Sequence, residues 1–242
     1  PEILELRQHY GFRLHADAAY GGYFILSDNL ASDTRKALAS LTQVDSIVLD
    51  PHKHGLQPYG CGCVLYRDPE VGKFYKHDSP YTYFSSSELH LGEISLECSR
   101  PGASAVALWA TQKLLPLVPD GEFSAGLFKA RAAALSLYEK IQSEKRFKNI
   151  FPPELEIVVL APNGRRASQI TERSEKVFRA AAEKNLHLAT FKYPSELLRS
   201  RWADVTFDRE DVICLRSCLM KPEHCDWIED IWKIIHAAAG TV

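Results

Sequence analysis

The chain has 242 residues, 45% of them hydrophobic and 25% charged, which is the ordinary range for globular proteins. Its formal net charge of -2 gives no electrostatic reason to expect a nucleic acid or an anionic membrane as a partner. No apolar run approaches the roughly 20 residues of a transmembrane helix, and no signal-peptide pattern opens the chain. We therefore expect a soluble, cytoplasmic protein.

Two details of composition refine this expectation. The six cysteines show neither a disulfide framework nor the paired spacing of a zinc site, so we expect reduced thiols and no metal. The only methionine is Met220, and the chain opens with Pro1. This start predicts a fragment of a longer polypeptide, or one piece of a cleaved chain.

The first part of the chain predicts alternating helices and strands. Residues 2–10 carry apolar residues at helical spacing, and Gly11 follows as a helix stop. Next come a strand at 12–17, a helix at 34–41, and strands at 45–50 and 62–67. A strand, a crossover helix and a second strand within about 40 residues form a βαβ unit, which indicates an α/β domain.

The second part begins after a long irregular stretch. Residues 68–97 are polar and aromatic with little periodicity, as expected of a functional loop or of one with short elements of its own. Further on, the pattern predicts helices at 103–115, 122–143, 168–185 and 222–239 and strands at 155–160, 186–193 and 212–218. These elements predict one α/β domain over residues 1–118 and a smaller one over residues 119–242.

Two polar side chains mark the ends of neighbouring strands. Asp17 closes the first strand, at the edge where open parallel sheets bind ligands. Lys53 follows the strand at 45–50 in a Pro-His-Lys turn, and so lies at the same edge. Each alone has a plainer explanation: Asp17 can begin a loop, Lys53 can be an exposed loop lysine, and His52 can be a packed histidine.

The pair together matches what pyridoxal 5′-phosphate requires. A carboxylate keeps the pyridine nitrogen of this cofactor protonated, and a lysine holds its aldehyde carbon as a Schiff base. The lysine then exchanges with a substrate amine, which requires a lowered pKa, from partial burial or from a cation such as protonated His52. The spacing therefore favours Asp17 and Lys53 as a cofactor site.

The same segments resemble a known family. The stretches HADAAYGG and DSIVLDPHKHG are similar to group II pyridoxal-phosphate-dependent amino-acid decarboxylases, which have the fold-type-I (aspartate aminotransferase-like) α/β fold. Similarity continues through PYGCGCVLYRD, SPYTYF, LECSRPGASAVALWATQKLL and LRSCLMKPEH. The resemblance implies that residues 1–118 are the later part of the large cofactor-binding domain and residues 119–242 the small C-terminal domain. It also implies a homo-oligomer, or a second chain carrying the N-terminal half.

The resemblance assigns roles to single residues. Asp17 would pair with the pyridine nitrogen, and Ala19 would pack on one side of the ring. Lys53 would carry the cofactor as the Schiff base, with His52 near the phosphate or the substrate. A loop tyrosine, either Tyr81 or Tyr83, would return a proton to the substrate carbon. These two tyrosines could instead anchor the loop on a neighbouring subunit.

The implied reaction is α-decarboxylation of an L-amino acid to its amine and carbon dioxide. Tyrosine or another aromatic amino acid is favoured, and an acidic amino acid is the next possibility. Arg100 and Arg216 could meet a substrate carboxylate, although a structural role suits each better. The alternatives are a carbon–carbon lyase of the sphingosine-phosphate lyase type and an inactive fragment or subunit that needs the missing N-terminal half.

Overall fold

The computed structural model describes residues 1–77, 90–94 and 102–240. By its contacts the chain divides into two compact units. The first unit comprises Pro1–Leu26 and Ser32–Gly121, and the second comprises Ser27–Ala31 and Glu122–Val242. Among the described residues, no helix has the length and apolar content that a membrane crossing requires.

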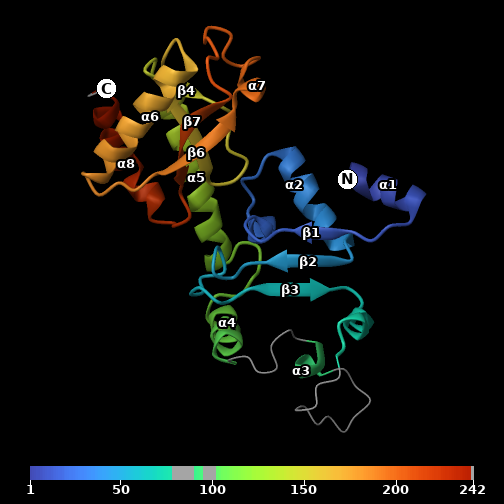
Figure 1. The fold of residues 1–242 in the computed structure, drawn as a ribbon. Coiled ribbons are helices and arrows are strands. Elements are labelled where there is room, and N and C mark those ends of the chain that lie inside the picture. Colours follow the sequence, from blue (N-terminus) through green and yellow to red (C-terminus); the bar gives the residue numbers. More distant parts are fainter. Residues whose placement is uncertain (78–89, 95–101, 241–242) are drawn as a thin grey trace. The chain divides into compact units, whose positions relative to one another are not determined.

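The first unit is built on a three-stranded sheet, in the order β1-β2-β3 (Figure 1). Strands β1 (His15–Asp17) and β2 (Ser46–Leu49) run parallel, and helix α2 (Ser32–Ala39) lies between them in the sequence. This confirms the predicted βαβ unit. Strand β3 (Cys63–Tyr66) pairs with β2 in the antiparallel sense, a direction that the sequence pattern did not specify.

The other elements of the first unit are helical. Helix α1 (Glu2–Tyr10) ends as predicted at Gly11, which adopts a left-handed backbone with φ 67°. The rest are α3 (Leu91–Ile94), α4 (Ala103–Leu114) and the 3-10 helices η1 (Gly22–Leu26), η2 (Ser40–Gln43) and η3 (Pro69–Phe74). Both η3 and α3 lie in the stretch that showed little periodicity, which therefore does contain short elements of its own.

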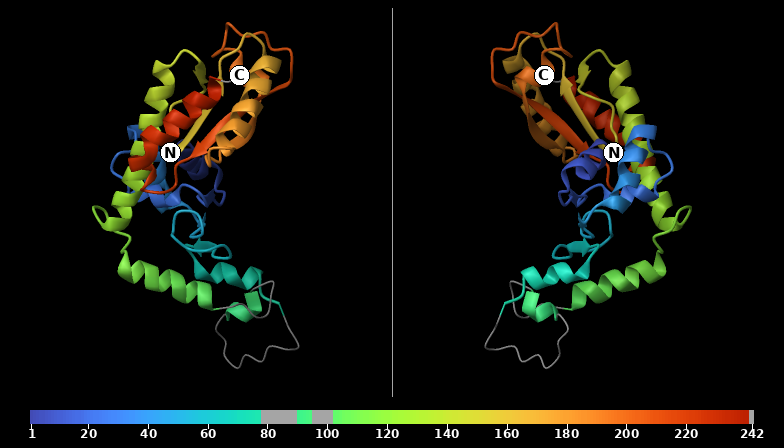
Figure 2. Two further views of the ribbon diagram at one scale, coloured as in Figure 1. Left: turned by 90° about the vertical axis from the view of Figure 1, so that its left-hand side faces the viewer. Right: turned by 90° about the vertical axis from the view of Figure 1, so that its right-hand side faces the viewer.

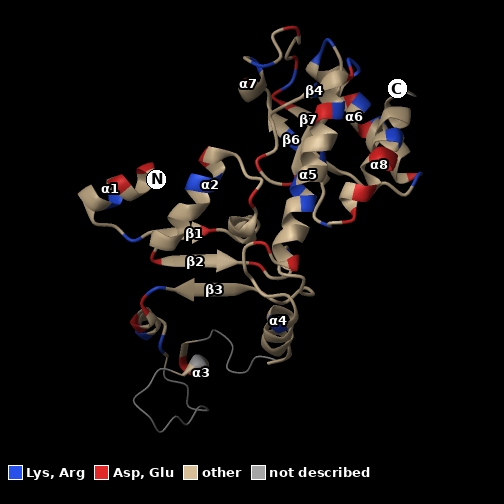
Figure 3. Ribbon diagram, turned by 180° about the vertical axis from the view of Figure 1, so that it is seen from behind, with Lys and Arg blue, Asp and Glu red and all other residues tan. Residues whose placement is uncertain are grey.

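The first unit leaves much of its apolar surface exposed. Strands β2 and β3 carry no charged residue (Figure 3), yet Val64 and Leu65 are each 50% exposed. Helices α1, α2 and α4 contain no buried residue, and Trp109 on α4 is 62% exposed. Apolar surfaces of this kind usually mark an interaction site, because exposing them to water is unfavourable.

The second unit is built on a four-stranded antiparallel sheet, in the order β4-β5-β7-β6. Its elements in chain order are α5 (Glu122–Ser143), β4 (Phe147–Asn149), β5 (Ile157–Pro162), α6 (Ala167–Ala182), β6 (Ala189–Pro194), α7 (Ser195–Leu198), β7 (Asp211–Cys218) and α8 (His224–Ala239). The predicted helices and strands are confirmed with shifts of a few residues. The sequence pattern missed β4 and α7, which are too short to show a period.

The two inner strands of this second sheet, β5 and β7, are largely buried on both faces. Along β5, Val158 and Leu160 join one apolar cluster, whereas Val159 and Ala161 join another. This alternation follows from the pleat of a strand, which points successive side chains to opposite faces. Helices α5 and α8 lie side by side (Figure 2) and contribute to the first cluster. The second unit therefore has a core of its own.

Two adjacent leucines of α7 provide a test of this core. Leu198 is fully buried in the second cluster, whereas Leu197 is 55% exposed. We expect Leu198→Ala to lower the free energy of unfolding by about 2–5 kcal/mol, because it removes buried methyl groups and leaves a cavity. Leu197→Ala should change it by no more than about 0.5 kcal/mol. Urea unfolding followed by tryptophan fluorescence measures both, and equal losses would contradict the described packing.

Candidate cofactor site

The parallel pairing of β1 and β2 brings two strand ends to one edge of the sheet. Asp17 lies opposite Val48 in the register, and the N–H of Ala18 donates to the Val48 carbonyl at 3.2 Å. Ala19 then connects the two ends. Its N–H donates to Oδ1 of Asp17 at 3.2 Å, and its carbonyl accepts from the N–H of Asp50 at 3.1 Å. The segments that carry Asp17 and Lys53 are therefore joined through one residue.

A tight turn after β2 presents the lysine. The N–H of Lys53 donates to the carbonyl of Asp50 at 2.9 Å, which closes the turn. Nζ of Lys53 lies 2.7 Å from Oδ2 of Asp50, and these side chains are 33% and 18% exposed. The ion pair keeps the amine beside the strand end. Sequence reasoning gave Asp50 no role, although its position three residues before the lysine was an available signal.

His52 connects the turn to the segment before β3. Its Nδ1 lies 3.0 Å from the carbonyl oxygen of Cys61, and its Nε2 lies 3.8 Å from Oδ2 of Asp50. The ring packs against Tyr59 at a centroid distance of 5.3 Å. These contacts place His52 beside Asp50 in the same turn as Lys53. That it contacts a cofactor phosphate stays a prediction.

The turn rests on a buried aromatic layer. His54 is 4% exposed, and its ring meets the edges of Tyr20 and Phe24 at centroid distances of 4.7 and 5.2 Å. Tyr23 is also buried, and burial raises its pKa to about 12. Sequence reasoning missed these supporting residues, although the aromatic residues that follow Asp17 were a visible cluster. The packing of these rings restricts the position of the turn that carries Lys53.

The remaining predicted site residues are placed less fully. Tyr81, Tyr83 and Arg100 lie outside the described residues. Arg216 lies on β7 in the second unit, where its positive charge partly opposes the rise that burial causes in the pKa of the Cys218 thiol. Its buried Nε has no hydrogen-bond partner within the described part of the chain. A role for Arg216 toward a carboxylate therefore stays a prediction.

The groups at the sheet edge fit pyridoxal 5′-phosphate by their chemistry. Lys53 offers a primary amine for the aldehyde, and Asp17 is an exposed carboxylate that can accept further hydrogen bonds beyond the one from Ala19. Ala19 has a side chain small enough for an aromatic ring to approach. No group of three potential His, Cys, Asp or Glu metal ligands is present among the described residues.

A family model with the description "Pyridoxal-dependent decarboxylase conserved domain" matches residues 1–161. The chain belongs to this family of pyridoxal-dependent decarboxylases. The match covers both strand ends of the candidate site and extends into the second unit. It confirms the resemblance that the two sequence segments predicted, and pyridoxal phosphate as the cofactor of the family.

Curated relatives of this decarboxylase-family chain have several named substrates. It is 34% identical over 116 residues to a probable L-aspartate decarboxylase of Pyrococcus abyssi, covering 48% of this chain and 29% of the relative. It is 29% identical over 154 residues to an L-tyrosine decarboxylase of Enterococcus faecium, covering 50% and 25%. A probable L-tyrosine/L-aspartate decarboxylase of Methanococcus maripaludis is 30% identical, covering 66% and 40%. The matched region is thus less than half of each relative.

Solved structures confirm the predicted fold. A structure of Oryza sativa TDC with PLP and tryptamine matches 99% of this chain and 46% of that one, with a TM-score of 0.76 and 15% identity. A tryptophan decarboxylase of Catharanthus roseus in complex with L-tryptophan matches 98% and 46%, with a TM-score of 0.72 and 18% identity. The fold of fold-type-I decarboxylases therefore extends over nearly the whole chain, which spans about half of these proteins.

Two glycines near the lysine turn test its geometry. A Cβ at Gly55 would lie 2.6 Å from both Cα of Pro51 and the hydroxyl oxygen of Tyr23, whereas one at Gly62 would meet only Oδ1 of Asp50, at 3.7 Å. We expect Gly55→Ala to displace the turn, lowering both the thermal midpoint and the amount of pyridoxal phosphate bound per chain. Gly62→Ala should leave both near wild type. Cofactor absorbance and thermal melting measure the effects, and normal cofactor binding by Gly55→Ala would contradict the assigned turn.

Proposed function

We propose that this chain is part of an enzyme that removes the α-carboxylate of an L-amino acid as carbon dioxide and releases the amine. The observation that carries the proposal is the placement of Asp17 and Lys53 at one edge of a parallel strand pair. Family membership supports the reaction class. Tyrosine or another aromatic amino acid is the favoured substrate, and an acidic one is the alternative; relatives named for tyrosine and for aspartate support these two classes.

Lys53 is the proposed attachment point of the cofactor. Its amine lies at the strand end, where the 2.7 Å contact with Asp50 restricts the side chain to few conformations. Less conformational entropy is therefore lost when the amine reacts. When bound, pyridoxal phosphate supplies a conjugated ring that accepts electrons from the bond that breaks. Lys53 would hold the aldehyde carbon of the cofactor, and its amine would exchange with the substrate amine and later with the product amine.

Asp17 is the proposed partner of the pyridine nitrogen. A carboxylate at that position holds a proton on the nitrogen and so stabilises the negative charge that develops on the substrate. The hydrogen bond from Ala19 orients this carboxylate before the ring binds. The Ala19 side chain would pack on the ring, and His52 would contact the phosphate or the substrate.

Two parts of the proposal concern the rest of the chain. Tyr81 or Tyr83 is the proposed proton donor to the substrate carbon. Residues 1–118 are the proposed later part of the large cofactor-binding domain, and residues 119–242 the small one. The division of the chain into compact units next to this boundary supports the domain assignment.

The proposed working enzyme is an assembly. Exposed apolar side chains on β3 and α4 support an interface there, with a second copy or with a polypeptide that carries the rest of the large domain. The proposed location is the cytoplasm. The five described cysteines are free, as is usual in that reducing compartment, and this supports the proposal. Analytical ultracentrifugation of the purified protein, with mass analysis of any co-purified chain, tests the assembly.

Replacing Lys53 tests the attachment point. Borohydride reduction of the loaded full-length protein should leave a cofactor adduct on the peptide that contains Lys53, as read by mass spectrometry. Lys53→Ala should lose this adduct and at least ~10³-fold of the decarboxylation rate, because the substitution removes the amine assigned to the covalent step. Lys36→Ala, an exposed lysine paired with Asp33, is the control and should keep both. An adduct that persists in Lys53→Ala would refute the assignment.

Replacing Asp17 tests the electrostatic role. Asp17→Asn removes the negative charge but keeps the shape, so cofactor should still attach to Lys53 while the rate falls about 10²–10³-fold. Carbon dioxide and amine, measured with L-tyrosine and L-aspartate, identify the substrate class. Release of an aldehyde without carbon dioxide would instead indicate a carbon–carbon lyase, and an unchanged rate would remove Asp17 from the mechanism.

A further inference from the structure

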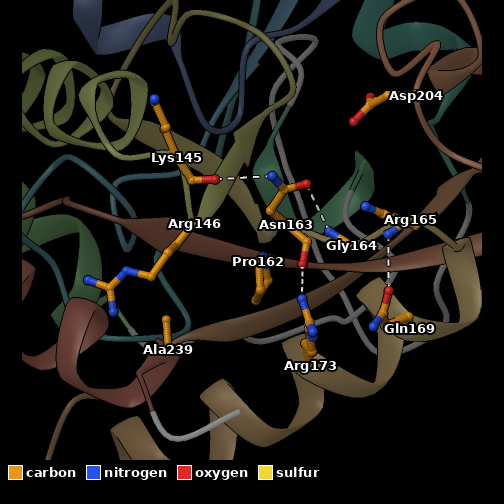
Figure 4. A pocket seen from close by; sticks show the side chains of 10 residues that line it. All are labelled: Lys145, Arg146, Pro162, Asn163, Gly164, Arg165, Gln169, Arg173, Asp204 and Ala239. Carbon is orange, nitrogen blue, oxygen red and sulfur yellow. Dashed lines mark hydrogen bonds between the residues drawn. The ribbon is translucent and has the colours of Figure 1, made fainter.

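The second unit contains a basic cavity that the proposed reaction does not use. The cavity has a volume of about 460 Å³ (Figure 4). Its lining comes from the segment after α5, the loop from the end of β5 to α6, the first half of α6, Asp204 and the last residue of α8. Its charged lining residues are four cations and one anion: Lys145, Arg146, Arg165, Arg173 and Asp204. The chain as a whole has a net charge of -2, so this positive charge is a local feature.

Two of the five charges are already neutralised. Both carboxylate oxygens of Asp204 accept hydrogen bonds from Nζ of Lys148 at 2.8 Å, which lower the pKa of Asp204. Arg146 is paired with Glu144 at 3.3 Å. The remaining cations, Lys145, Arg165 and Arg173, form no ion pair within the described part of the chain. Three of the four cations that line the cavity therefore have no ion-pair partner among the described residues.

The loop that carries these residues is held in place by its own hydrogen bonds. The N–H of Asn163 donates to the Arg146 carbonyl at 2.6 Å, and the N–H of Gly164 donates to Oδ1 of Asn163 at 2.9 Å. The N–H of Arg165 donates to Oε1 of Gln169 at 3.0 Å, and the Arg173 guanidinium donates to the Asn163 carbonyl (Figure 4). Because these hydrogen bonds already order the loop backbone, little backbone conformational entropy is lost when a ligand binds.

The first amides of α6 do not provide the site. The N–H of Ala167 donates to the Thr206 carbonyl at 3.0 Å, and the N–H of Ser168 donates to Oδ1 of Asp208 at 2.9 Å. These two amides are therefore occupied, and the side chains are the groups that the proposed site uses. None of the lining residues is aromatic, so the cavity offers a ligand charge and hydrogen bonds rather than a stacking surface.

We propose that this cavity binds a small multivalent oxyanion, such as a phosphorylated metabolite. Guanidinium groups present forked N–H donors that match phosphate and carboxylate oxygens, and such charge-assisted hydrogen bonds are stronger than neutral ones. Arg165 and Arg173 supply these guanidinium donors, and the ammonium group of Lys145 adds a third positive charge. The volume is that of a small-ligand site. None of these residues belongs to the proposed cofactor site, so the inference adds a binding activity to the decarboxylase.

The test uses inorganic pyrophosphate as the probe. Binding to the cofactor-loaded, full-length protein is measured by calorimetry in buffer without phosphate or sulfate, at ionic strength held constant with sodium chloride. Arg165→Gln and Arg173→Gln should each weaken binding at least about tenfold, because each loses a hydrogen-bonded charge. Arg179 is exposed on α6, the helix that carries Arg173. Arg179→Gln makes the same change in net charge, and its affinity for pyrophosphate should stay within about twofold of wild type.

A second measurement separates binding from folding. The thermal midpoint without ligand shows whether each variant folds, and the rise in midpoint on adding pyrophosphate should vanish only in the two cavity variants. Citrate, tested in parallel, distinguishes a polycarboxylate ligand from a phosphate ligand. Tight binding of pyrophosphate or citrate supports the site if Arg165→Gln and Arg173→Gln weaken it. Absence of binding by both probes, or equal weakening in Arg179→Gln, would overturn it.

Discussion

The parallel pairing of β1 and β2 is the constraint on which the candidate site depends. Two strands that run in the same direction end at the same edge of their sheet, and the chain between them must cross over to begin the second strand. Asp17 and the turn that carries Lys53 therefore meet at one edge, although they are far apart in the sequence. Ala19 reinforces this arrangement, because its N–H and its carbonyl bond to the two strand ends.

The lysine turn is fixed from several directions, as a site that must position a reactive amine requires. The ion pair with Asp50 holds the amine, and the contact of His52 with the Cys61 carbonyl holds the base of the turn. Beneath it, the buried His54 ring packs on aromatic neighbours. Each contact restricts a different part of the turn, so less conformational freedom remains to be lost when the cofactor and substrate bind.

The two units differ in how far their sheets are covered. Parallel strands are usually buried on both faces, and the uncharged sequence of β2 is of that kind; its antiparallel neighbour β3 is also uncharged. In the first unit they remain partly exposed, which agrees with a chain that spans about half of the solved decarboxylases it matches. In the second unit the inner strands β5 and β7 are covered on both faces. A basic cavity on such a self-contained unit can bind a ligand without taking part in the chemistry.

The sequence by itself determined the family, the candidate site residues and the long elements, because these depend on local patterns. The period of α5, the apolar run of β2 and the motifs around Asp17 and Lys53 are all visible within a few residues. Only the tertiary structure decided the direction of β3, the short β4 and α7, and the contacts that support the site. The packing of His54 on Tyr20 and Phe24 and the basic cavity join groups whose distances no local pattern encodes, since they depend on how separate segments pack.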